Sequence, residues 1–336
     1  MADTKSTASP EDILVGGQAV IEGVMMRTPR AYAVAVRRLD GTIEIKREAV
    51  RRLSERCKIF SWWVVRGFAV LIQSLALGIK TLNYSINVSI QDLEAQEAAG
   101  AGAEAAKNGV PEKAETGKKK SGNNALSIAS SMILGVAAAV LLFILLPLGL
   151  TTLLKGYFSV VDNWVVFNLV DGVIRVVVFF AYLLAISRLK DIKRVFEYHG
   201  AEHKVVHTWE DGAELTVANA RPRPTQHPRC GTSFLMFVMV ISILVFSIFK
   251  FHAFWAIFLS RVVLIPVVSG LSYELIRLSA PRCKKGFFRL LVLPGLALQS
   301  ITAKEPSDDQ LEVAIRALHE SLELDGVKLR ESTSVA

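Results

Sequence analysis

The chain has 336 residues, 51% of them hydrophobic, and a formal net charge of +8. The apolar residues lie in long blocks, a distribution that is typical of membrane proteins and excludes a single soluble domain built around one core. The basic residues lie between those blocks without interleaved aromatic residues, which predicts contact with membrane lipids and no nucleic-acid binding.

Residues 1–58 are predicted to form an N-terminal cytosolic segment that contains a β-hairpin. Apolar residues alternate in Tyr32–Arg38 and in Thr42–Glu48, on either side of Asp40-Gly41. An Asp-Gly pair between two alternating segments is a strong hairpin signal. Two apolar pieces punctuated by glycine precede it at Gly16–Met26, so we expect a small unit with some sheet.

Residues 59–82 are apolar but contain Arg66 and Gln73. A charge at the middle of a membrane costs about 3 kcal/mol on insertion scales. This segment is therefore predicted to be an interfacial, re-entrant or transmembrane helix, and the basic residues on both sides of it favour the first two. Residues 83–124 are rich in Ala, Gly, Glu and Lys, which predicts a disordered linker.

Four later blocks are long and apolar enough to be transmembrane helices, at residues 126–154, 158–187, 233–249 and 253–276. The basic clusters lie in alternate connections, while the turns around Lys155 and Lys250 are nearly uncharged. The positive-inside rule then predicts an integral protein of the bacterial plasma membrane, with residues 188–232 and the C-terminus in the cytosol.

The C-terminal part is predicted to lie at the membrane surface and in the cytosol. Residues 284–302 contain Pro294 and are expected to be interfacial. Ser307 and Gln310 form a capping box that opens an amphipathic helix over residues 307–324, followed by a tail over 325–336. The expected fold is mainly α, a polytopic helical membrane protein with a small cytosolic α+β portion that contains the N-terminal β-hairpin.

Residues 188–232 hold four of the six histidines of the chain. On a helix, His199, His203 and His207 lie four residues apart on one face, and imidazoles so spaced can converge on one metal ion. His199–His203 also reads H-x-x-E-H, in which Glu202 would be the catalytic general base. The pattern predicts a site for a divalent metal, zinc before others.

His227 and Cys230 offer two further ligands on a turn constrained by proline and glycine. Two alternatives stay open at this point. The histidines would also suit contacts with headgroups or backbone carbonyls, and Cys230 would also suit a small buried position. Gln18 and Glu22 are candidate substrate-binding residues that would fold over the site, although packing between loop and strand explains them equally well.

Charged residues inside the apolar blocks form a second set of candidates. Asp171 and Arg175 are four residues apart, so they can pair on one helix face. Arg66 and Arg261 have no such neighbour, and arginine within a span is a candidate for binding a substrate anion, such as a lipid phosphate. Glu274 would either neutralise one arginine or serve as a further metal ligand.

Five motifs stand out between residues 16 and 305: Gly16–Arg27, Phe196–Lys204, His227–Phe234, Ser269–Leu278 and Pro294–Thr302. In these motifs the chain resembles the DUF1385 (YqhQ-like) family of membrane proteins, which are described as predicted metal-dependent enzymes. The resemblance implies a membrane protein with several spans. Its metal-dependent label rests on the same His/Glu/Cys residues and adds no independent support for a metal.

The leading hypothesis is a membrane-embedded metal-dependent hydrolase that acts near the cytosolic interface. Its partners would be membrane lipids, with an anionic lipid or lipid-linked substrate, and its oligomeric state is left open. One alternative is a transporter or lipid-handling protein with a structural metal site, closed by four ligands. The other is a membrane scaffold that docks partners through the amphipathic helix at 307–324.

Overall fold

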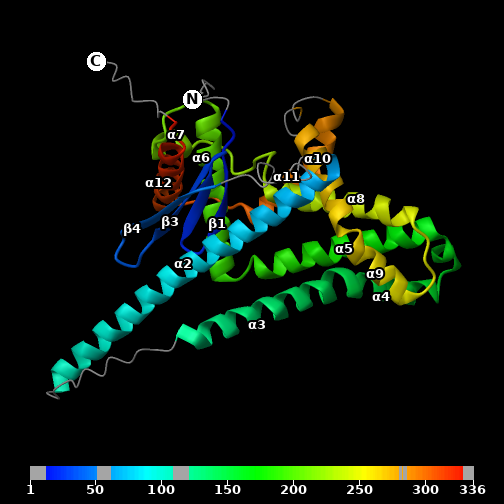
Figure 1. Ribbon diagram of the computed structural model, residues 1–336, viewed down its shortest axis with the longest axis horizontal. Coiled ribbons are helices and arrows are strands. Elements are labelled where there is room, and N and C mark those ends of the chain that lie inside the picture. Colours follow the sequence, from blue (N-terminus) through cyan, green and yellow to red (C-terminus); the bar gives the residue numbers. More distant parts are fainter. Residues whose placement is uncertain (1–12, 51–61, 109–120, 280–281, 283–285, 328–336) are drawn as a thin grey trace, which may run out of the picture. The chain divides into compact units, whose positions relative to one another are not determined.

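The computed structural model describes residues 13–50, 62–108, 121–279, 282 and 286–327. It is mainly helical, with one four-stranded antiparallel sheet near the N-terminus. The chain divides into two compact units, and Figure 1 shows the elements of both. One unit comprises Met1–Asp92, Leu183–Val238 and Ser269–Ala336, and the other comprises Leu93–Tyr182 and Met239–Val268.

The sheet is a meander in the order β1-β2-β3-β4. Its strands are β1 (Gly16–Val20), β2 (Gly23–Arg27), β3 (Ala31–Arg37) and β4 (Ile43–Ala49). The hairpin predicted around Asp40-Gly41 is confirmed as β3 and β4, and Gly41 has the positive φ of 87° that the turn requires. The glycine-punctuated segment forms a further hairpin, in which Glu22 of the turn has a φ of 52°.

Alternate side chains of the sheet point to opposite faces, and both faces are covered. On one face, buried residues such as Val20 and Val34 pack against Tyr84 and Val88 of the long helix α2 (Trp63–Asn108). On the other face, the sheet packs against α6 (Lys190–Glu210) and α12 (Asp308–Leu324). The sheet therefore forms the middle layer of its unit.

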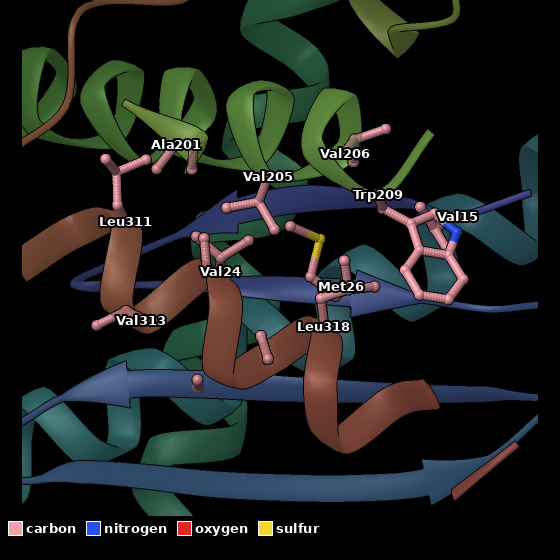
Figure 2. Close-up of a cluster of buried hydrophobic side chains, with 14 of the residues drawn as sticks. Val15, Val24, Met26, Ala201, Val205, Val206, Trp209, Leu311, Val313 and Leu318 are labelled. Atoms are coloured by element: carbon pink, nitrogen blue, oxygen red, sulfur yellow. The ribbon is translucent and has the colours of Figure 1, made fainter. Parts of the chain in front are cut away.

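Figure 2 shows the core between the sheet and the two helices. Val24 and Met26 of β2 lie between Val205 of α6 and Leu318 of α12, and all four side chains are fully buried. The capping box predicted at Ser307 is present, since its hydroxyl accepts from the backbone N–H of Gln310, and the Gln310 side chain accepts from Ser307. The predicted amphipathic helix is thus confirmed, and its apolar face is buried.

Helix α2 differs from the expectation for this part of the chain. It continues to Asn108, well into residues 83–124, for which the composition predicted a linker. Alanine, glutamate and glutamine favour helix, and Tyr84 and Val88 bury apolar surface against the sheet. Residues 109–120 of the predicted linker lie outside the described residues.

Four described helices have the length and apolar composition to cross a membrane, and a bent pair makes a fifth candidate. The four are Val65–Ala98 within α2, Ile133–Lys155, α5 (Trp164–Ile186) and α8 (Gly231–Ile248), and the pair is α9 (Phe254–Val263) with α10 (Ile265–Ser279). All four predicted spans coincide with apolar helices of this set. The chain therefore has the long apolar helices of an integral membrane protein.

Prolines explain two breaks in these helices. Residues 133–155 run through α3 (Ser121–Val140), a π-helical turn (Leu141–Leu145) and α4 (Leu146–Lys155). Pro147 follows the π-helical turn, and Pro266 follows the 46° bend between α9 and α10. Proline lacks the N–H that a helix needs, so it loosens the preceding turn.

The remaining elements are short or lie near the C-terminus. They are a 3₁₀ turn (Ser159–Asp162), α7 (Val217–Ala220) and α11 (Gly286–Thr302). The segment predicted to be interfacial at 284–302 is thus an apolar helix, α11, with Pro294 inside it. It carries Gln299, which bears on the site described next.

Candidate metal centre

Helix α6 presents its histidines on the side away from the sheet. Tyr198, Ala201 and Val205 point into the hydrophobic core. His199 and His203 are rotated from that core-facing side by about a quarter to a half turn of the helix. Helix α6 runs through the H-x-x-E-H motif, so the condition on which the four-residue spacing depended is met.

Gly200 lies inside this motif because a neighbouring segment crosses the helix there. A β-carbon at Gly200 would lie 1.8 Å from the carbonyl oxygen of Lys304. The Lys304 N–H donates to the carbonyl of Phe196 at 2.8 Å, which holds the crossing segment in place. The glycine costs helix propensity but lets the end of α11 reach the histidine face.

Two histidines of α6 are oriented by backbone carbonyls. His199 Nδ1 lies 2.7 Å from the carbonyl oxygen of Thr302, and His203 Nδ1 lies 2.5 Å from that of Thr225. A carbonyl only accepts, so each Nδ1 carries a proton, and in the neutral ring Nε2 is the nitrogen that has the lone pair. This is the arrangement that prepares imidazoles for a metal.

Cys230 completes the first ligand group, which we define as His199, His203 and Cys230. Its Sγ lies 3.1 Å from His199 Nε2, and one ligand atom from each of the three residues lies within 4.8 Å of the others. His203 Nε2 is buried and has no hydrogen-bond partner among the described residues. Leaving a buried polar atom unpaired costs about 1–3 kcal/mol. Two imidazole nitrogens and one sulfur fit a divalent ion such as zinc.

His207, Glu210 and His227 form a second group, which satisfies the same 4.8 Å limit. His207 Nε2 donates to the carbonyl of Gln226 at 2.9 Å, and its ring lies 4.6 Å from that of His227. His227 Nε2 donates to Glu210 at 3.2 Å. The structure thus divides the predicted ligands between two groups, although the spacing alone suggested one convergent set.

Electrostatics in the second group favour a neutral imidazole beside an ionised carboxylate. Burial lowers the pKa of His207, so its ring is uncharged at neutral pH. Burial acts to raise the pKa of Glu210, but the hydrogen bond and charge of His227, together with Arg229, outweigh it, and the net pKa of Glu210 is lowered. Arg229 forms an ion pair with the same carboxylate.

Gln299 of α11 fixes the turn that carries His227 and Cys230. Its Oε1 accepts from the His227 N–H at 2.7 Å, while its Nε2 donates to the His227 carbonyl and to Ser233 Oγ, both at 2.9 Å. Gln299 is completely buried. Sequence reasoning missed this positioning residue, although it lies within the motif Pro294–Thr302.

Glu202 lies between the histidine face and the sheet. Glu202 is buried, with 7% of its surface exposed. Its Cγ would lie 3.0 Å from a β-carbon added at Gly17 of β1. Gly17 and Gln18 line a cavity of 380 Å³ together with residues of β2 and α2. Gln18 pairs with Met25 on the face that packs against α2, so the cavity and the predicted base lie on opposite faces of the sheet.

The other predicted substrate-binding residues of this unit are engaged in ion pairs. Glu22 pairs with Arg194 of α6. Arg66 holds Glu274 through both carboxylate oxygens, at 2.6 and 2.7 Å. Glu274 belongs to neither ligand group among the described residues.

Arg175 and Arg261 share one carboxylate in the other unit. Asp171 lies 2.7 Å from Arg175 Nη2 and 2.6 Å from Arg261 Nη1. Arg175 Nε also donates to the carbonyl of Phe143 at 3.1 Å. In a regular helix that carbonyl would accept from the N–H of residue 147, but Pro147 has no N–H. The predicted pair Asp171–Arg175 is present, and the structure adds Arg261 to it.

Comparisons with known proteins agree with the motifs. Residues 62–324 match the family described as "Protein of unknown function (DUF1385)". The chain is 33% identical over 313 residues to "Uncharacterized protein YqhQ" of Bacillus subtilis (strain 168), with 93% of each chain covered. No solved structure matches. The family match extends over much more than half of the chain, and the chain therefore belongs to the DUF1385 family.

Proposed function

We propose that this protein is a membrane-embedded metal-dependent hydrolase. The observation that carries the proposal is His203 Nε2, a buried lone pair without a hydrogen-bond partner among the described residues. His203 forms one group with His199 and Cys230, in which one ligand atom of each residue lies within 4.8 Å of the others. These three side chains would hold the ion, and three protein ligands is the number that catalytic zinc sites use.

The roles of the chain's own residues follow from this arrangement. His199, His203 and Cys230 would hold the ion, which when bound supplies a Lewis acid that activates water for hydrolysis. Glu202 would accept and return the proton that hydrolysis moves, because it lies on the same helix and is mostly buried. Gln18 lines the 380 Å³ cavity on the α2 face of the sheet, across the sheet from α6, so it has no part in this arrangement.

The site would lie at the cytosolic face of a bacterial plasma membrane. The connection that carries both ligand groups also contains Arg188, Lys190, Lys193 and Arg194, whereas the turns at Lys155 and Lys250 are poor in charge. Basic connections stay in the cytosol. This location supports a substrate embedded in or anchored to the membrane, either an anionic lipid or a lipid-linked molecule.

Two other functions have less support. A structural metal site is closed by four ligands, but the first group has three His, Cys, Asp or Glu donors among the described residues. A scaffold that docks partners through α12 would need its apolar face free, and Leu311, Leu318 and Leu322 of that face are buried against the sheet unit.

The test uses solvent oxygen as a tracer. The zinc-loaded protein, reconstituted in liposomes, is incubated with a bacterial membrane lipid extract in ¹⁸O-labelled water, and products are identified by mass spectrometry. We expect a product that carries ¹⁸O, that chelation suppresses, and that Glu202→Gln lowers about 100-fold or more while retaining its zinc. Labelled product formed equally by Glu202→Gln, or no labelled product from the loaded wild type, would contradict the proposal.

A further inference from the structure

The second ligand group lies next to the first along the histidine face of α6. His207 follows His203 by four residues, which is about 6 Å along a helix axis. The rings of His203 and His227 are 5.8 Å apart. The two groups are neighbours but share no residue. Each has its own loop contact, because Thr225 orients His203 and Gln226 orients His207.

His227 Nε2 donates to Glu210 and His227 Nδ1 accepts from the Arg229 N–H, so an ion in the second group would replace the proton that His227 shares with Glu210. His227 Nε2 lies 3.2 and 3.3 Å from the two carboxylate oxygens of Glu210. Atoms bound tetrahedrally to one zinc ion at about 2.0–2.1 Å are separated by about 3.3 Å. His207 Nε2 donates to Gln226, so its Nδ1 keeps the lone pair that an ion would take.

A third cluster on the surface provides a contrast. His319, Glu320 and Glu323 of α12 also lie within 4.8 Å of one another, but His319 is exposed and Arg47 pairs with both glutamates. The second group differs because it has two imidazoles, and His227 is only 3% exposed. Its turn is also fixed by Gln299. We therefore treat the cluster on α12 as an ordinary charged surface.

We propose that His207, Glu210 and His227 form a second metal site, which takes a divalent ion of the zinc type. Its role rests on the proposed function, since two neighbouring ions would together bind and polarise a phosphate or carboxyl substrate. Arg229 is the competing cation at Glu210. The site therefore binds its ion more weakly than the first group does.

Cobalt distinguishes the two sites, because only the first contains a thiolate. The full-length protein in detergent is stripped with a chelator and titrated with Co²⁺, and bound cobalt is measured together with the thiolate-to-cobalt absorption band. We expect one ion per group in the wild type. Glu210→Gln and His207→Ala should each lose the weaker ion but keep the thiolate band, and Arg229→Gln should tighten the weaker site several-fold. His319→Ala is the control and should match the wild type.

The outcomes separate the second site from the proposed function. If the wild type binds a single cobalt with the thiolate band, and Glu210→Gln and His207→Ala leave that value unchanged, the second site does not exist while the first stands. If Glu210→Gln removes the band together with both ions, the groups are not independent and the inference fails. Absence of the band in the wild type would instead overturn the first site.

Discussion

Glu22 has a backbone conformation that is unfavourable for residues with a β-carbon, and its side chain contacts helix α6. Its φ is 52°, in the left-handed region, which costs a residue with a β-carbon about 1 kcal/mol or more. The carboxylate pairs with Arg194, and its other oxygen lies 3.5 Å from the hydroxyl of Tyr198. The strain at this turn is thus tied to the contact between the glycine-rich hairpin and the histidine helix.

A matched pair of variants separates these two effects. Glu22→Gly and Glu22→Ala both lose the ion pair with Arg194, but glycine also relieves the positive φ. We expect Glu22→Ala to be the less stable of the two by about 1 kcal/mol. Thermal unfolding of both proteins in the same detergent measures the difference. Equal midpoints would mean that the turn is not strained.

Among the described residues, Asp171 is the only anion that forms an ion pair with Arg175 and Arg261. Replacing it with asparagine leaves two guanidinium groups buried without a counter-charge, and loss of one partner of a buried pair costs about 3–5 kcal/mol. We expect Asp171→Asn to unfold at clearly lower temperature than the wild type. Asp162→Asn is the control, because Asp162 is exposed and lies 3.6 Å from Lys155. A similar loss in both variants would contradict this account.

At the scale of elements, the contact between α6 and the end of α11 depends on one glycine. An added β-carbon at Gly200 would collide with the Lys304 carbonyl at 1.8 Å, and that backbone cannot rotate away as a side chain would. The displaced segment includes Thr302, which orients His199. We expect Gly200→Ala to cost about 1–3 kcal/mol of stability and to weaken zinc binding.

Gly149→Ala is the matched control for this variant. Gly149 also lies inside a helix, but apart from its own helix backbone and chain neighbours no atom of the described residues lies within 4 Å of an added β-carbon there. Alanine favours helix over glycine by up to about 1 kcal/mol, so the control should be neutral or slightly stabilised. Calorimetry and a zinc titration of both variants check the pair. Unchanged stability in Gly200→Ala would show that the segment after α11, at Lys304, does not cross α6 so closely.

Local patterns predicted much of the fold, and contacts between distant segments explain what they missed. Asp40-Gly41 and the capping box at Ser307 are decided within a few residues, so both could be read from the sequence. The first hairpin turns at Glu22, a residue type that does not mark a turn of positive φ. Gln299 acts on His227, 72 positions away, and no local pattern reveals such a partner.

The candidate site was predictable in its residue types but not in its grouping. A spacing of four places His199, His203 and His207 on one helix face, which the structure has. Whether such residues meet at one point depends on the loop opposite. There the carbonyl of Thr225 accepts a hydrogen bond from His203, and the carbonyl of Gln226 accepts one from His207. The sequence therefore indicates a metal-ligating surface, and only the tertiary contacts divide it into two groups.

At the scale of the whole molecule, the charge pattern predicts the orientation in the membrane. We expect Lys250→Cys to react in intact cells with a thiol reagent that does not cross membranes, because its turn would lie outside. Lys190→Cys should react only after permeabilisation, and the wild type provides the background from its native cysteines. Labelling of Lys190→Cys in intact cells would reverse the proposed orientation.

The most direct measurement of the central claim is the metal content of the protein purified in detergent at neutral pH. Elemental analysis is made for zinc, iron and manganese on the wild type, His203→Ala and the surface control His319→Ala. The account predicts a stoichiometric divalent metal in the wild type and the control, and its loss in His203→Ala, whose Nε2 is the buried lone pair. A wild type without stoichiometric metal, or a His203→Ala protein that keeps all of it, would contradict the account.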